Sequence, residues 1–214
     1  MTKRILIKNG TVFDGKSVKK ADVLIENDRI AGVGKKFGSV KGTDVIDASG
    51  KITLPGFICA HHHLYSTFAR GMGIPGAPAK NFQEVLERLW WPLDRALDEE
   101  DVYLSSLFAL GECIKSGTTT IIDHQESQNF QKGSLDAIMK AVEKSGIRAA
   151  LTLGASDRYG RGAEGVEENE RFLEKLKKES HPLVRGMAGL HASFTVNDRT
   201  LAATAILAKK YNCG

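Results

Sequence analysis

The first 54 residues alternate short apolar runs with turn signals. Three of these runs are each followed closely by a dipeptide typical of tight turns: Asn9-Gly10, Asp14-Gly15 and Asn27-Asp28. Dipeptides of this kind accept positive φ and close hairpins between strands. We therefore expect residues 1–54 to form a small antiparallel β module. The module contains no His or Cys, so we interpret it as a structural platform.

From residue 55 to residue 214 the pattern changes to an apolar run, a loop and an amphipathic helix, repeated. Apolar runs predict strands at 55–63, 118–122, 147–153 and 183–190. Apolar residues at helical spacing predict helices at 81–97, 98–117, 134–145, 167–178 and 197–211. Strands and helices in alternation indicate an α/β fold with a parallel sheet. A closed (β/α)8 barrel needs eight strands and ~250 residues, so four units correspond to half of one.

Three of the six histidines stand together at the end of the first of these strands, in Pro55–His63. Because side chains alternate along a strand, His61 and His63 should share one face and His62 the other. Two neutral imidazoles on one face suit a divalent metal ion. The alternatives are solvated histidines or a purification tag, although tags stand at termini. Cys59 should lie on the face of His61, about 6.6 Å deeper at ~3.3 Å per residue.

Polar residues also follow two later strands. Asp123-His124 follows the second strand, and His191 follows the fourth. The carboxyl ends of parallel strands are where α/β barrels place their chemistry. For Asp123 and His124, a purely structural hydrogen-bonding role remains an equal alternative.

A glycine-rich stretch, residues 154–165, contains Arg158 and Arg161. We expect these arginines to be solvated, with the steering of an anionic substrate group as the alternative. The adjacent Trp90 and Trp91 present a similar choice. Packing in the core is the simpler interpretation, and stacking on a flat ring is the other.

Composition excludes several classes of protein. The net charge of +4 is spread along the chain without a basic block, so no nucleic-acid partner is indicated. The three cysteines are widely spaced, which argues against a disulfide framework. No signal-peptide core or membrane-length apolar run occurs. We expect a cytoplasmic protein with a small-molecule substrate and no membrane partner.

Motifs across the chain resemble the amidohydrolase superfamily, in its deaminase/chlorohydrolase branch. Pro55–His63 is similar to the signature PGFxDxHxH, and further matches are Phe68–Gly71, Ser116–Thr120 and Gly189–His191. The resemblance implies that His61 and His63 bind a divalent metal ion, most often zinc, and that His191 contacts substrate. Cys59 departs from the pattern, since the family commonly has Asp or Asn there. It also implies a barrel preceded by a small antiparallel β-sandwich, to which residues 1–54 would correspond.

The resemblance implies a metal-dependent hydrolase acting on carbon–nitrogen bonds other than peptide bonds. An aminohydrolase, or deaminase, of a nitrogen heterocycle would use hydroxide formed at the metal ion. The family's His-x-x-Glu pair, with its proton-shuttling glutamate, and its later ligands would follow residue 214. We therefore expect this chain to be inactive alone, lacking a C-terminal half or forming a homo-oligomer. Alternatives are a chlorohydrolase, a cyclic-amide hydrolase, which normally has a carboxylated lysine at the fourth strand, or a non-catalytic partner subunit.

Overall fold

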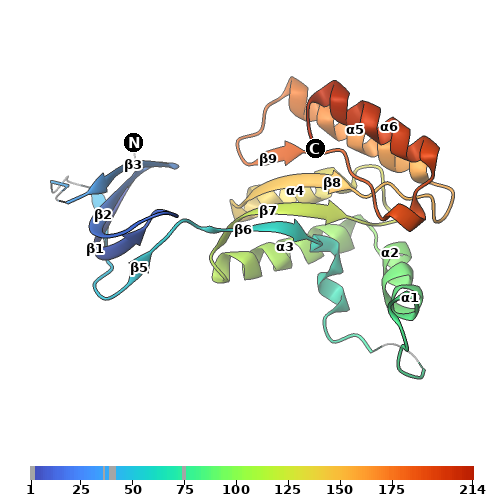
Figure 1. The fold of residues 1–214 in the computed structure, drawn as a ribbon, viewed down its shortest axis with the longest axis horizontal. Coiled ribbons are helices and arrows are strands. Elements are labelled where there is room, and N and C mark those ends of the chain that lie inside the picture. The colour runs from blue at the N-terminus through green and yellow to red at the C-terminus, as the bar shows by residue number, and fades with distance from the viewer. Residues whose placement is uncertain (1–2, 36, 39–41, 74–75) are drawn as a thin grey trace. The chain divides into compact units, whose positions relative to one another are not determined.

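The computed structural model describes residues 3–35, 37–38, 42–73 and 76–214 (Figure 1). The chain divides into two compact units, Met1–Gly56 and Phe57–Gly214. Each unit is built around a β-sheet of its own. No helix among the described residues combines the length and the apolar character needed to cross a membrane.

The first unit is a mixed sheet rather than an antiparallel one. Its strands are β1 (Arg4–Phe13), β2 (Val18–Glu26), β3 (Arg29–Gly34), β4 (Thr43–Asp47) and β5 (Ile52–Thr53). The order is β3-β2-β1-β4, with β5 also beside β1. β1 to β3 pair antiparallel, but β4 and β5 run parallel to β1. The antiparallel prediction is therefore wrong for these two strands, because the chain after β3 returns to the opposite edge of β1 instead of making another hairpin.

Asn9-Gly10 does not close a hairpin, contrary to the prediction. Both residues lie within β1, where the pairing with β2 shifts between Ile7 and Gly10. Asn9 has a φ of +63°, so the positive φ that this dipeptide accepts is used for a β-bulge. The described residues supply one sheet, whereas a sandwich needs two, so the sandwich stays a prediction.

The second unit has the predicted α/β organisation. Its parallel strands pair in chain order: β6 (Phe57–His62), β7 (Thr118–Gln125), β8 (Arg148–Leu153) and β9 (Val184–Gly186). Figure 1 shows these strands side by side with helices between them in the chain. The helices are α1 (Phe82–Val85), α2 (Trp91–Ala96), α3 (Glu99–Lys115), α4 (Ser134–Ser145), α5 (Gly162–Lys178) and α6 (Asp198–Tyr211), with a 3-10 helix, η1 (Leu64–Ala69), directly after β6.

Capping residues explain where several helices begin and end. Asp98 Oδ1 accepts from the backbone N–H of Asp101 at 3.0 Å, and Asp101 Oδ2 accepts from the backbone N–H of Asp98 at 3.2 Å. This capping box starts α3. Gly146, with a φ of +77°, ends α4 as its left-handed cap. α5 starts at Gly162, five residues before the predicted position, and its first turn packs closely: a Cβ on Gly165 would lie 2.8 Å from Ala155 Cα.

One large apolar core lies between the sheet and its helices. Buried side chains from η1, α3, α4, β7, β8 and α5 meet there, including Leu64, Leu110, Ile138, Ile121, Leu151 and Phe172. The strand residues of this core face the helices. The alternate residues of β7, which are Thr120, Ile122 and His124, lie on its other face.

Candidate metal centre

The structure brings His61 and His63 together. Their Nε2 atoms lie 2.9 Å apart. The Nδ1 atom of His63 lies 2.9 Å from the backbone oxygen of His124. Because a carbonyl only accepts, Nδ1 of His63 carries the proton, and its Nε2 presents a lone pair toward His61. Metal-binding histidines usually have this arrangement, in which one ring nitrogen donates a hydrogen bond and the other is free to bind the metal ion.

The chemistry of this pair fits part of a zinc site. Neutral imidazole nitrogens are common zinc ligands. Burial, with the neighbouring histidines, lowers the pKa of His63, which favours the neutral ring that a ligand requires. Catalytic zinc usually has three protein ligands. In the part of the chain that the structure describes, no three His, Cys, Asp or Glu side chains form such a group, so His61 and His63 supply part of a donor set.

Cys59 lies on the other face of β6, contrary to the sequence interpretation. Cys59 pairs with Ile121, and His62 pairs with Asp123. Between these two pairs, β6 advances by three residues and β7 by only two. This extra residue is a β-bulge that shifts the alternation of side chains. Cys59 and His62 consequently line one hollow with Cys113, whose Sγ is 3.9 Å from His62 Nε2.

The two polar residues at the end of β7 face opposite sides of the sheet. Asp123 is fully buried, and its Oδ1 accepts from the backbone N–H of Leu64 at 2.7 Å. Desolvation raises the pKa of Asp123 to about 7. His124 lies on the face of the histidine pair, with ring centroids 6.4 Å from His61 and 5.5 Å from His63. Asp123 therefore has a structural bond, whereas His124 joins the candidate site.

His191 lies on the far side of His124, with 6.2 Å between ring centroids. Its Nδ1 is 2.8 Å from Thr195 Oγ1, and that hydroxyl donates to the backbone oxygen of Ala192. Since the hydroxyl proton is used there, His191 Nδ1 donates and its Nε2 is left as an acceptor. Burial and the charge of Arg158 lower the pKa of His191 to about 4, so the ring is neutral.

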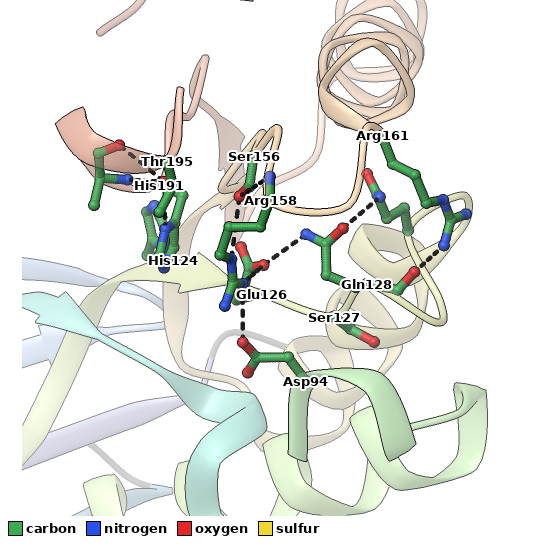
Figure 2. Close-up of polar contacts among 12 residues, drawn as sticks. Asp94, His124, Glu126, Ser127, Gln128, Ser156, Arg158, Arg161, His191 and Thr195 are labelled. Carbon is green, nitrogen blue, oxygen red and sulfur yellow. Dashed lines mark hydrogen bonds and ion pairs between the residues drawn. The ribbon is translucent and has the colours of Figure 1, made fainter. Parts of the chain in front are cut away.

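Arg158 is buried, which corrects the expectation of a solvated side chain. Figure 2 shows it between two carboxylates. Its side chain is 5% exposed, that of Asp94 2% and that of Glu126 1%. Arg158 Nη2 lies 3.0 Å from Asp94 Oδ2 and pairs with Glu126 Oε1. Arg161 is closer to the solvated interpretation: it forms a half-exposed pair with Glu164, although it also donates to the backbone oxygen of Gln128.

The sequence carries little signal for this cluster. Asp94 is 64 residues from Arg158 and Glu126 is 32 residues from it, and no local pattern joins them. Burial, with the charge of Glu126 next, raises the pKa of Asp94 to about 7. Burial also raises the pKa of Glu126. The guanidinium of Arg158 is therefore shared by the buried carboxyl groups of Asp94 and Glu126.

An aromatic hollow lies beside the histidines. Its volume is about 290 Å³, and its lining includes His63, His191, Asp94, Tyr65, Phe82, Trp90 and Trp91. Trp90 also packs against the core, as the packing interpretation expects, and stacking of either tryptophan on a flat ring stays a prediction. Asp94 Oδ1 is buried and has no hydrogen-bond partner among the described residues. The hollow thus combines flat apolar walls with a few polar groups, as small-molecule sites do.

Histidines gathered at the carboxyl edge of a parallel sheet are characteristic of α/β metal-dependent hydrolases. The sequence pattern of the amidohydrolase family matches residues 52–214. The chain belongs to the amidohydrolase family, and the predicted family is confirmed.

Individual relatives are deaminases. The chain is 36% identical to the 5-methylthioadenosine/S-adenosylhomocysteine deaminase of Thermococcus sibiricus, over 92% of this chain and 45% of that protein. It is 34% identical to the 5'-deoxyadenosine deaminase of Methanobrevibacter smithii, over 98% of this chain and 47% of that protein. The chain thus spans about half the length of the curated relatives it matches.

A solved structure shows the same fold. The adenosine deaminase from Xanthomonas campestris, determined with bound zinc, superimposes with a TM-score of 0.81 at 21% identity. The match covers 98% of this chain and 47% of that one. At this identity the likeness is evidence of fold alone.

Proposed function

We propose that this chain supplies half of a zinc-dependent deaminase acting on a nitrogen heterocycle of the nucleoside type. In this proposal the sheet β6-β7-β8-β9 is the first half of a (β/α)8 barrel, and the β module belongs to a small sandwich beside it. The observation that carries the proposal is the pair of facing Nε2 atoms in His61 and His63. The names of the relatives support the substrate class.

His61 and His63 would hold the zinc ion. When bound, zinc lowers the pKa of water to about 7 and so supplies a nucleophile at neutral pH. The remaining ligands and the proton-shuttling glutamate would come from residues outside these 214. The hydrogen bond from His63 Nδ1 to His124 keeps the ligand nitrogen unprotonated and oriented.

The aromatic hollow would bind the substrate next to this pair. Phe82 and Trp91 offer flat surfaces on which a heterocycle stacks. His191 Nε2 would accept a hydrogen bond from an N–H or O–H group of the substrate. Asp94 Oδ1 would accept a second one, because its other oxygen is occupied by Arg158. These contacts would fix the orientation of the ring relative to His63.

The test compares this chain with the protein extended to the length of its relatives. We expect the extended protein to contain zinc and to release ammonia from adenosine-type nucleosides, and the 214-residue chain to do neither. Tight, stoichiometric zinc in the short chain would contradict the half-site proposal. An extended protein that contains zinc but deaminates no heterocycle would favour a chlorohydrolase, a cyclic-amide hydrolase or a non-catalytic subunit. Gel filtration of both forms tests the predicted homo-oligomer, and cell fractionation the predicted cytoplasmic location.

A further inference from the structure

We infer that His124 is a positioning residue that couples His63 to His191, an inference that rests on the proposed function for the roles of those two histidines. His124 contacts His63 and Leu190, the residue before His191, through different atoms. Its backbone oxygen accepts from His63 Nδ1 at 2.9 Å, and its ring Nε2 lies 2.8 Å from the backbone oxygen of Leu190. His124, near the end of β7, thus bonds the proposed zinc ligand His63 through its backbone and the Leu190 peptide through its ring.

The contact with Leu190 fixes the state of the His124 ring. Because the Leu190 oxygen only accepts, Nε2 of His124 carries the proton and donates it. Its Nδ1 is buried and has no hydrogen-bond partner among the described residues. Through this bond to Leu190, the ring links the end of β7 to the segment before His191, 66 residues away in the chain.

The absence of a side chain at Gly154 leaves room for the His124 ring. A Cβ at Gly154 would lie 2.3 Å from Cε1 and 2.8 Å from Nε2 of His124, which is closer than such atoms approach one another. The residue after it, Ala155, accepts from the backbone N–H of His191 at 3.1 Å. The segment just after β8 therefore holds the His191 segment by its backbone, and His124 reaches past Gly154 to the Leu190 carbonyl.

The two contacts of His124 can be separated by substitution. The bond to His63 uses the backbone, so any side chain at position 124 leaves that acceptor in place. The bond to Leu190 uses the ring, so only a side chain with a donor in a similar place preserves it. Loss of the ring should therefore release His191 from its Thr195 partner while His63 keeps its proton on Nδ1.

The experiment measures ring nitrogen signals by NMR in protein labelled with 15N-histidine, for the wild type, His124→Leu, His124→Gln and Gly154→Ala. We expect His124→Leu to lose the single-tautomer signature of His191 and to retain that of His63. His124→Gln should restore the His191 signature, because the amide of glutamine donates from a similar position. Gly154→Ala should reproduce the loss with the His124 side chain still present.

A His191 signature that is unchanged in both His124→Leu and Gly154→Ala would overturn the inference. So would equal changes at His63 and His191, since they would indicate a general loss of structure. In a His124→Ala background, Gly154→Ala should add little further change, because the two closest atoms that its Cβ would meet belong to the removed ring and only Glu126 Oε2, at 3.1 Å, remains. The measurement needs neither zinc nor turnover. An extended protein without deaminase activity would therefore count against the proposed function and leave this result to be judged separately.

Discussion

Asp123 and Leu64, 59 residues apart in the chain, are joined by a 2.7 Å hydrogen bond from the backbone N–H of Leu64 to Asp123 Oδ1. Both residues are fully buried. Leu64 directly follows His63, so this bond fixes the start of η1 against β7. The geometry of the candidate metal ligand therefore depends on a carboxylate on the opposite face of the sheet.

Replacing Asp123 by Ala should lower the free energy of unfolding by about 1–3 kcal/mol, because it leaves a buried N–H without a partner. Asp123→Asn keeps an acceptor oxygen and serves as the matched control. Urea unfolding of both variants checks the prediction. Equal stability of the Ala and Asn variants would show that the bond contributes nothing measurable.

The raised pKa of Asp123 predicts a dependence of stability on pH. A carboxyl group whose pKa rises from 3.8 to about 7 on folding binds its proton more tightly in the folded state. Its contribution is then most favourable below pH 3.8 and declines as the pH rises to about 7. Subtracting the pH profile of Asp123→Asn from that of the wild type should reveal this decline. A difference that stays constant between pH 4 and pH 7 would contradict it.

Removing Arg158 should be strongly destabilising. Arg158→Met would leave Asp94 and Glu126 buried together without a cation, and breaking such a cluster costs about 3–5 kcal/mol. Arg161→Met is the control, since its half-exposed pair with Glu164 contributes about 1 kcal/mol or less. Thermal unfolding of the two variants should separate them clearly. Similar losses in both would mean that the buried cluster has no special role.

Zinc binding by the extended protein should distinguish the neighbouring histidines. His63→Ala should weaken binding by more than about 100-fold, because even an outer partner of a ligand contributes 10–100-fold. His62→Ala should bind zinc as the wild type does, since His62 faces Cys113 on the other side of β6. Competition with a chromophoric chelator measures both affinities. A comparable loss in His62→Ala would refute the assignment of faces.

Substrate binding should depend on the aromatic hollow. Phe82→Ala in the extended protein should raise KM by roughly tenfold with a smaller effect on kcat, given the ~0.5–1.5 kcal/mol of an aromatic contact and the area it buries. Phe108→Ala is the control, because Phe108 lies outside the hollow beneath Arg70. Steady-state kinetics on an adenosine-type nucleoside would show the split. An unchanged KM in Phe82→Ala would place the substrate elsewhere.

Sequence patterns located most elements because the signals for them are local. The box at Asp98 and the glycine at 146 mark helix ends within a single turn of chain. The parallel order of β6 to β9 follows from the alternation of strands and helices. For the same reason, the pairing of β4 with β1 was missed: it depends on a connection whose path no local pattern specifies.

In the candidate site, too, the features with a local sequence signal were predicted and those that depend on distant residues were missed. The facing of His61 and His63 was predicted from alternation alone, and their ligand role remains a prediction. The burial of Arg158 was missed, because its partners come from α2 and the segment after β7, and its own loop is rich in glycine. The face of Cys59 was predicted wrongly, since alternation assumes that every residue of a strand is paired.

The bulge in β6 gives three consecutive histidines two separate environments. If β6 alternated regularly, without a bulge, Cys59 would share the face of His61 and place a thiol beneath the imidazole pair. With it, the sulfur atoms of Cys59 and Cys113 are kept behind the strand with His62. Within this six-residue strand the thiol of Cys59 therefore neighbours His62 instead of lying beneath the facing Nε2 atoms of His61 and His63.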